Sequence, residues 1–278
     1  MEKHAKIIAF CSGYNIAMDI KRNSLSDSDR VSIEKAAAYL SMASHAVAFT
    51  GAGISTPSGI PDFRSPQSGL WNQSDPFKVA SLWAFHKHPE DFFNWIRPLA
   101  INSESAQPNK AHLGLAQLED QGVIKSVITQ NIDGLHFKAG SKKVLELHGT
   151  AQSATCPSCG RKHPREYFYQ LLTQGDDFPR CSECNNIIKP DIVLFGEALP
   201  QNVWNAAYQE CLLADLILVV GSSLEVSPAN SLPETALMNN ALLIINNLGQ
   251  THLDYKAVLL LIMDVEQGIG GLLNYLPG

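Results

Sequence analysis

The sequence has no cluster of basic residues, and this absence limits the partners that it can bind directly. Its 278 residues include 21 lysines and arginines against 27 aspartates and glutamates, which gives a formal net charge of −6. Direct binding to nucleic acid needs a concentrated positive surface that neutralises phosphates. We therefore predict no direct nucleic-acid partner.

Long apolar runs are also absent, and no stretch is long and apolar enough to span a bilayer. The N-terminus resembles a short signal sequence, because Lys3 and Lys6 precede the apolar residues 7–11. That run is short, however, and Phe10 is too bulky for a signal-peptide cleavage site. We interpret residues 1–30 as an unprocessed N-terminal extension, and we predict a cytoplasmic protein that has no membrane partner.

Cysteine is scarce, since six residues among 278 are too few for a disulfide scaffold. Four of them form two Cys-x₂-Cys pairs, Cys156 with Cys159 and Cys181 with Cys184. Two such pairs can present four thiolates to one tetrahedral zinc ion. Because no position is then left for water, we predict a structural Zn²⁺ site. Two disulfides are the alternative for these cysteines.

Apolar segments of two kinds alternate along the rest of the chain. The spacing of Ile33, Ala36 and Leu40 predicts a first helix, with Ser28 or Asp29 as its N-cap. Short, almost entirely apolar runs then alternate with helix-like segments, which is typical of a parallel sheet covered by helices on both faces. The predicted strands are residues 46–50, 124–128, 144–147, 192–195, 216–220 and 242–245.

Two stretches interrupt this alternation and are interpreted as insertions. Residues 57–111 are rich in Trp and Phe, and residues 150–189 are polar and carry the cysteine pairs. The predicted fold class is α/β, with a parallel-sheet domain into which these two stretches are inserted. The predicted boundaries are 1–30 for the N-terminal extension; 31–56, 112–149 and 190–278 for the parallel-sheet domain; 57–111 for the first insertion; and 150–189 for the zinc module.

A dense motif, residues 51–64, follows the first predicted strand. Gly51 and Gly53 stand where glycine allows a tight turn and a close approach to a ligand such as a pyrophosphate. The dinucleotide-binding fingerprint is incomplete here. The motif continues into Asp62, Phe63 and Arg64, whose carboxylate, ring and guanidinium favour a polar, flat ligand. An ordinary turn between a strand and a helix is the alternative.

Polar residues follow other predicted strands as well. Gln130, Asn131 and Asp133 come directly after one strand, and His148 follows the next one. The ordinary pKa of histidine, about 6.5, makes His148 a candidate general base. Ligands of open α/β sheets bind at the carboxyl ends of the strands, so we predict a site at that edge. Helix capping is the alternative for Asn131 and Asp133. Polar groups at further strand ends are Gly221-Ser222-Ser223, Asn246-Asn247 and Asp264.

The order of these motifs along residues 31–278 resembles that of the sirtuins, NAD-dependent protein-lysine deacylases, and within them the bacterial branch. The motifs that carry the resemblance are Gly51–Arg64, Gly69-Leu70-Trp71, Thr129–His136, Leu147-His148-Gly149, the Cys₄ cluster, Lys189–Glu197, Gly221–Leu224 and Asn247.

The resemblance implies that the parallel-sheet domain is a Rossmann-type NAD-binding domain and that residues 57–111 form a cofactor loop and helical insert. It also implies a smaller inserted domain made of the Cys₄ zinc module and the helical insert. Individual residues would have roles in the cleft between the two domains, where NAD binds. The catalytic residues would be His148, Asn131 and Asp133. The cofactor-binding residues would be Ala52, Gly53, Thr56, Asp62, Phe63, Arg64, Gln130, Asn131, Ile132, Asp133, Gly221, Ser222, Ser223, Asn247 and Asp264. The residues that contact the substrate would be Val193, Phe195, Gly196, Glu197 and Val226.

The resemblance also implies a reaction that consumes NAD as a co-substrate. The acyl oxygen of an acyl-lysine in a protein or peptide would attack the ribose carbon that bears nicotinamide. His148 would then remove a proton from a ribose hydroxyl, and the products would be free lysine, nicotinamide and O-acyl-ADP-ribose. The peptide would add as a strand between residues 193–197 and 225–227. Mono-ADP-ribosyl transfer and a non-catalytic NAD sensor are the alternatives.

Overall fold

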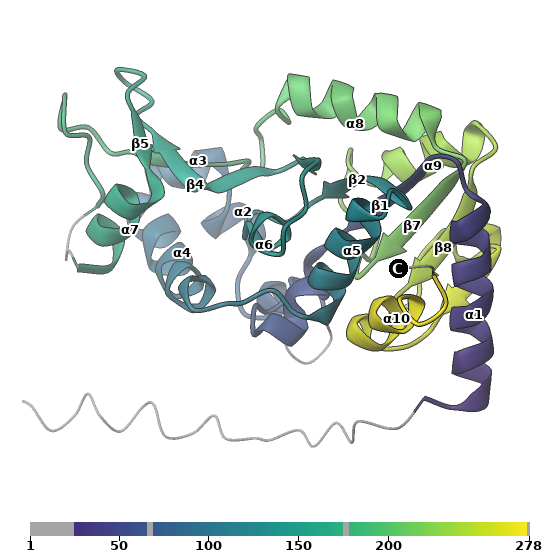
Figure 1. The fold of residues 1–278 in the computed structure, drawn as a ribbon. Coiled ribbons are helices and arrows are strands. Elements are labelled where there is room, and N and C mark those ends of the chain that lie inside the picture. Colours follow the sequence, from purple (N-terminus) through teal and green to yellow (C-terminus); the bar gives the residue numbers. More distant parts are fainter. Residues whose placement is uncertain (1–24, 66–68, 175–177, 277–278) are drawn as a thin grey trace, which may run out of the picture.

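The computed structural model describes residues 25–65, 69–174 and 178–276, and the first 24 residues of the predicted extension lie outside them. Its largest element is a six-stranded sheet in which every neighbouring pair is parallel (Figure 1). The predicted parallel α/β sheet is confirmed. In spatial order the strands are β3 (Val144–Glu146), β2 (Ile124–Thr129), β1 (Ala46–Thr50), β7 (Leu216–Val220), β8 (Leu242–Asn246) and β9 (Leu259–Leu261).

Helices cover both faces of this sheet because its central strands are buried on both sides. Alternate residues of β1 point in opposite directions, so Ala46 and Ala48 pack in one core while Val47 and Phe49 pack in the other. The helices of the first core are α1 (Asp27–Met42), α5 (Lys110–Asp120) and α10 (Val265–Leu272), and those of the second are α8 (Gln201–Leu213) and α9 (Ser231–Met238).

The first helix begins earlier than its sequence pattern indicates. The N-cap of α1 is Ser26, whose side chain accepts the backbone N–H of Asp29 while the Asp29 carboxylate accepts the N–H of Ser26. This capping box satisfies two N–H groups that the first turn leaves free. The predicted caps, Ser28 and Asp29, were therefore wrong, and α1 includes the last residues of the predicted extension.

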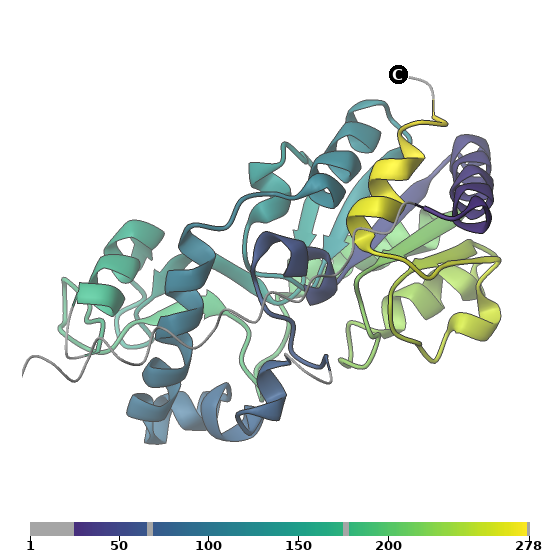
Figure 2. The ribbon, with the colours of Figure 1, turned by 90° about the horizontal axis from the view of Figure 1, so that it is seen from below.

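A second, three-stranded sheet lies at the far end of the molecule from α1 and α10 (Figures 1 and 2). Its strands are antiparallel, in the order β5 (Lys162–Pro164), β4 (Gly149–Thr155) and β6 (Lys189–Ile192). The prediction of a strand at residues 192–195 in the large sheet was wrong. The strand β6 ends at Ile192, which pairs with Gly149 at the end of the small sheet, and residues 193–195 continue from it as a loop.

Helices of the two inserted segments pack against each other beside the small sheet. A third core joins Phe92 and Phe93 of α4 to Phe168 of α7 and to Ile188. The remaining helices are α2 (Pro76–Val79), α3 (Leu82–Lys87), α4 (Pro89–Glu104), α6 (Leu135–Lys138) and α7 (Arg165–Gln174), with short 3₁₀ helices η2 (Ala52–Ser58), η3 (Leu70–Asn72) and η4 (Asp254–Lys256).

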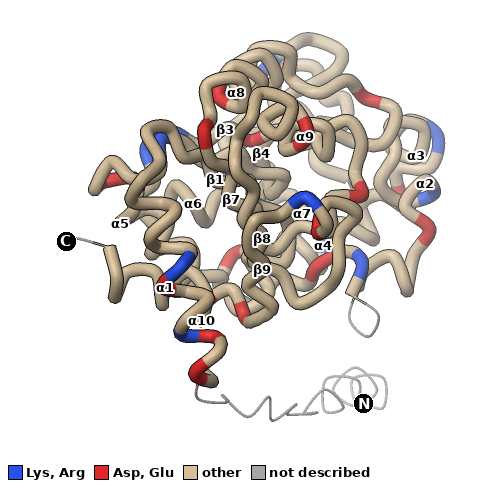
Figure 3. Tube along the Cα trace, turned by 90° about the vertical axis from the view of Figure 1, so that its right-hand side faces the viewer, with Lys and Arg blue, Asp and Glu red and all other residues tan. Residues whose placement is uncertain are grey.

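Charges are spread over the described part of the chain. Figure 3 shows lysines and arginines on several separate elements, interspersed with acidic residues. Among the described residues, no helix combines the length and the apolar character that crossing a membrane requires.

Candidate functional site

Two glycine loops meet backbone to backbone at the carboxyl edge of the large sheet. The N–H of Gly53, after β1, donates to the carbonyl of Gly221, after β7, at 2.8 Å. A Cβ on Gly53 would lie 2.8 Å from that carbonyl oxygen, and a Cβ on Gly221 would lie 2.3 Å from the nitrogen of Ile54. Gly221 also has φ +62°, which disfavours other residues. Glycine here permits close packing of the two loops, which places the N-terminus of η2 beside the loop after β7.

The end of β2 joins the first of these loops through buried polar side chains. The Asn131 amide donates to the carbonyl of Gly51 and to the hydroxyl of Ser55, both at 3.1 Å. The Ser55 hydroxyl in turn donates to the Asp133 carboxylate at 2.7 Å. Ser55, a residue that the sequence analysis did not single out within its motif, thus connects two predicted site segments, residues 51–64 and 129–136.

The imidazole of His148 has one nitrogen committed and one available. Its Nδ1 lies 2.9 Å from the carbonyl oxygen of Gln130. A carbonyl can only accept, so Nδ1 carries the proton and Nε2 carries the lone pair. The side chain of Gln130 donates to the hydroxyl of Ser222 at 2.8 Å. Gln130 therefore fixes the orientation of the His148 ring and links it to the loop after β7.

The surroundings of His148 favour its neutral form. Burial lowers the pKa of His148 below its ordinary value, the hydrogen bond to the Gln130 carbonyl opposes that shift, and the positive charge of Arg64 adds to it. Arg64 itself pairs with Glu225, with 2.9 Å between Nε and a carboxylate oxygen. This ion pair joins the loop that follows η2 to the loop that follows β7.

Two predicted residues of the cofactor loop have local contacts. Asp62 accepts the backbone N–H groups of Arg64 and Ser65 at 3.0 and 2.7 Å and also the Ser65 hydroxyl, so its carboxylate holds its own loop. Phe63 stacks on Trp71, with ring centroids 5.0 Å apart. The loop is thus shaped by its own side chains before any ligand enters.

Two asparagines lie at the end of β8, on the other side of β7. The side chain of Asn247 contacts the loop after β7, whereas the side chain of Asn246 does not. Asn247 accepts the N–H of Ser222 at 3.0 Å and donates to the carbonyl of the same residue at 2.6 Å. Asn246 is fully buried and donates to the carbonyls of Leu261, the last residue of β9, and of Met263, so our expectation that it reaches a ligand was wrong. Asp264 caps α10, where its carboxylate accepts the N–H of Glu266 at 2.8 Å.

The predicted substrate segment lies against His148. The N–H of Val193 donates to the His148 carbonyl at 2.7 Å, while Phe195 pairs with Ala80 and Leu82 of the helical insert at 2.9 and 3.0 Å. The other predicted residues lie on the same loops and strand ends, namely Ala52, Thr56, Ile132, Ser223, Gly196, Glu197 and Val226.

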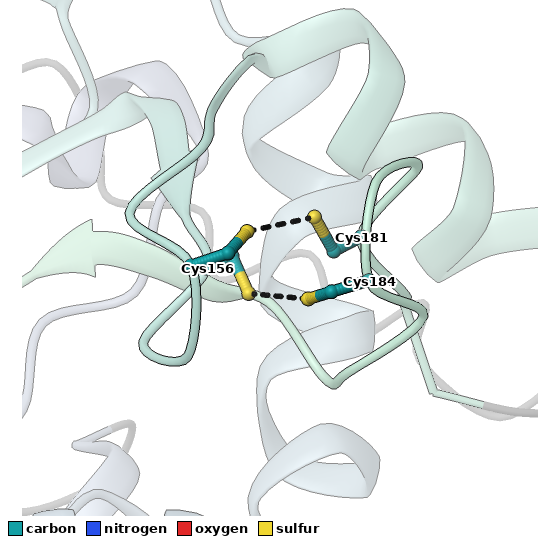
Figure 4. Close-up of side chains that lie close together, drawn as sticks. Cys156, Cys181 and Cys184 are labelled. Atoms are coloured by element: carbon teal, nitrogen blue, oxygen red, sulfur yellow. Dashed lines mark hydrogen bonds between the residues drawn. The ribbon is translucent and has the colours of Figure 1, made fainter.

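The four cysteines of the two Cys-x₂-Cys pairs converge, and their sulfurs face one another from two loops (Figure 4). All four sulfurs lie within 4.8 Å of one another, with 3.4 Å between Cys156 and Cys184 and 3.6 Å between Cys159 and Cys181. A tetrahedral zinc ion with Zn–S bonds of about 2.3 Å holds its sulfurs about 3.8 Å apart. The four cysteines are free thiols, so the alternative of two disulfides is not seen, and the donor set fits zinc.

Two buried histidines near Asp133 were missed. His112 accepts the N–H of Asn109 at Nδ1 and lies 3.4 Å from the Ser55 hydroxyl at Nε2. The His136 ring packs against it, with centroids 4.9 Å apart, and contacts the Thr50 hydroxyl at 2.9 Å. The sequence gives little sign of either histidine. His112 follows three residues after Asn109, a residue type that often caps helices, and His136 is the last residue of the Thr129–His136 motif.

We expect these two histidines to make the protein sensitive to mild acid. Burial lowers the pKa of His112 to about 4 and that of His136 to about 3. The unfolded chain takes up protons near pH 6.5, where the folded chain does not. Stability should therefore fall as the pH drops below 6.5, by up to about 1.4 kcal/mol per pH unit for each group.

Urea unfolding at pH 7 and pH 5 measures this effect, with His136→Gln as the comparison. Every other titrating group is shared by the two proteins, so the difference between their pH slopes isolates His136. The wild type should lose more stability over this interval than the variant. Equal losses would contradict the assignment.

A parallel sheet whose glycine loops meet at its carboxyl edge, combined with a Cys₄ module, defines a Rossmann-type α/β protein with a zinc-binding insertion. The chain belongs to the Sir2 family, whose model matches residues 51–228, so the predicted family is confirmed. An NAD-dependent protein deacetylase of Saccharolobus solfataricus is 48% identical over 224 residues, covering 80% of this chain and 87% of that protein. One of Thermotoga maritima is 45% identical over 221 residues, covering 80% and 89%.

Solved Sir2 structures have the same fold. One, with a deacetylated p53 peptide and 3′-O-acetyl ADP-ribose, is 41% identical with a TM-score of 0.83 and covers 87% of this chain and 97% of its own. Another, with a p53 peptide and NAD⁺, is also 41% identical, with a TM-score of 0.80 and the same coverage.

Proposed function

We propose that this protein is an NAD-dependent protein-lysine deacetylase, which cleaves NAD to nicotinamide and transfers the acyl group to ADP-ribose. The observation that carries the proposal is the state of His148, whose Nδ1–H is held by Gln130 and whose Nε2 is left as a base. Membership of the Sir2 family and the names of its relatives support the same activity.

The residues around the glycine loops fit a dinucleotide. The N-terminus of η2, which no side chain caps, and the packed loop after β7 would border a pyrophosphate, and Arg64 adds a positive charge. Asn131 and Asp133, held by Ser55, line the pocket that we assign to nicotinamide and its ribose. When bound, NAD supplies a ribose carbon with a good leaving group, and the chain itself contributes binding and orientation.

His148 is the proton acceptor in this proposal. Its Nδ1–H···O bond to Gln130 fixes the tautomer and aims Nε2, and its lowered pKa keeps Nε2 unprotonated at neutral pH. A ribose hydroxyl placed within hydrogen-bond reach of Nε2 would lose its proton to this atom. The positive charge of Arg64 also lowers the pKa of His148, which helps to keep the ring neutral before the reaction.

The substrate is proposed to be an extended acyl-lysine peptide that adds as a strand beside residues 193–197. Gly196 is exposed there, and within the described chain no backbone hydrogen bond uses its N–H or its carbonyl. Such free groups on an ordered loop are what strand addition requires. Phe195 stands beside them, against the rings of Phe77 and Trp71, and would border the channel for the lysine side chain.

Zinc would be held by Cys156, Cys159, Cys181 and Cys184, where it would cross-link the two loops without taking part in the reaction.

We also propose a cytoplasmic location, because these thiols must stay reduced. The domain boundaries given under the sequence analysis remain our proposed division of the chain, and the dispersed charges support the absence of a nucleic-acid partner.

The proposal is tested by incubating an acetyl-lysine peptide with the purified chain, with and without NAD, followed by mass spectrometry. We expect loss of the acetyl group only with NAD, together with nicotinamide and O-acetyl-ADP-ribose. Label from NAD appearing covalently on protein without acyl loss would favour ADP-ribosyl transfer instead. Binding of NAD without any turnover would favour a sensor.

A further inference from the structure

The loop formed by residues 193–197, here called the substrate loop, is held from three directions. Its first N–H, that of Val193, donates to the carbonyl of His148 in the large domain. Phe195 exchanges backbone hydrogen bonds with the helical insert, as described above. The third attachment is a salt bridge between Lys189 of β6 and Glu197, with 3.0 Å between Nζ and a carboxylate oxygen.

This salt bridge is part of a compact set of hydrogen bonds that defines the shape of the loop. The same oxygen of Glu197 accepts the N–H of Leu194 at 2.8 Å, and the N–H of Glu197 donates back to the Leu194 carbonyl at 2.9 Å. Lys189 also donates to the carbonyls of Pro190 and Ile192, at 3.1 and 2.7 Å. One ammonium group therefore binds three oxygens that surround the start of the loop.

The salt bridge is shielded from water. The side chain of Lys189 is 15% exposed and that of Glu197 is 22% exposed. Ion pairs on open surfaces contribute little, but removing one partner of a shielded, hydrogen-bonded pair leaves the other charge uncompensated. Substitution of Lys189 should therefore change the conformation or the order of the substrate loop.

We propose that Lys189 and Glu197 are positioning residues, whose salt bridge holds the substrate loop in the shape that accepts the peptide strand. The proposal rests on the proposed function, since it assigns a role in binding that substrate. It changes the role expected for Glu197, because its carboxylate turns toward Leu194 and Lys189 and braces the loop from within. The exposed backbone of Gly196, between them, is the part left for the peptide.

Steady-state kinetics test the proposal with Lys189→Met, which keeps the length of the side chain but removes its donors. We expect KM for the acetylated peptide to rise by about tenfold, as loss of a charge-assisted hydrogen bond predicts. Because Nε2 of His148 and the glycine loops are untouched, kcat and KM for NAD should stay within about twofold of wild type. Lys189→Arg, which keeps the charge, should restore the peptide KM.

Hydrogen exchange gives a readout that needs no catalysis. The amides of Val193 and Leu194 should exchange faster in Lys189→Met than in wild type, with zinc content unchanged. Lys142→Met is the matched control, because it breaks an ion pair with Asp120 on the open surface and should alter neither the loop nor KM. An inactive wild type would reject the proposed function, while exchange would still decide the role of Lys189. The proposal would be overturned if hydrogen exchange and the peptide KM were both unchanged in Lys189→Met. It would also be overturned if KM for NAD rose as much as KM for the peptide.

Discussion

Replacing His148 with alanine is expected to lower kcat for deacetylation by about 10²–10⁴-fold, the usual cost of losing a general base. No other imidazole can take its place in the described site. The rings of His112 and His136 are buried and engaged with Ser55 and Thr50. Burial lowers the pKa of both histidines, so they are neutral, but burial also keeps them away from the substrate.

The fold should survive this substitution. Among the described residues, the His148 side chain makes one hydrogen bond, to Gln130, whereas the bond that holds Val193 uses the His148 backbone and persists in alanine. Thermal unfolding and NAD binding measured beside kcat separate a chemical defect from a structural one. His252→Ala is the control, since that ring lies on the surface beside Glu234 and should leave kcat unchanged. Near-normal turnover of the His148 variant would remove this residue from the mechanism.

The pH dependence of wild-type kcat provides a second check on the same residue. A base works only when unprotonated, and the pKa of His148 lies below the ordinary value of about 6.5. Activity should therefore persist as the pH falls through 6.5 and decline only at lower pH. A decline centred above 6.5 would contradict the assignment of His148 as a buried base.

The sequence was sufficient to predict the edge of the sheet at which the site lies. Apolar runs identify strands by their composition, and the carboxyl ends of parallel strands necessarily share one edge. Gln130, His148 and Gly221, which follow three different strands, could therefore be assigned to one site from the sequence alone. The cysteine pairs were equally clear, because metal coordination dictates their spacing.

Other features depend on contacts that no local pattern reveals. Ser55, His112 and Asp133 are far apart in the chain, and only the packing of η2 against α5 and the end of β2 brings them together. Asn246 has the composition of a ligand-binding residue, yet tertiary packing against Gly268 buries it. The apolar run 192–195 looks like a strand, but only Ile192 belongs to one, and the backbone partners of Val193 and Phe195 are His148 and the helical insert.

Removing a zinc ligand should lower deacetylase activity as strongly as His148→Ala does, but through loss of structure. Binding of structural zinc is worth about 10–16 kcal/mol in small zinc modules, which is comparable with the entire stability of a typical domain. Cys156 and Cys181 are buried in the third core, which also contains Leu194 of the substrate loop. We therefore expect Cys184→Ser to lose zinc, to unfold the small sheet and to lose most deacetylase activity.

The large sheet should remain folded in this variant, because its two cores are separate from the third. Metal analysis and hydrogen exchange measure both halves of the prediction: protection should disappear in β4, β5 and β6 while β1 and β7 stay protected. Cys211→Ala is the control, since this buried thiol lies in the core of the large sheet and should leave zinc binding intact. A purified wild type without zinc, or one that keeps its small sheet after chelation, would show that the four thiols do not hold a structural ion. Loss of zinc that also unfolds β1 and β7 would show instead that the two parts fold as one unit.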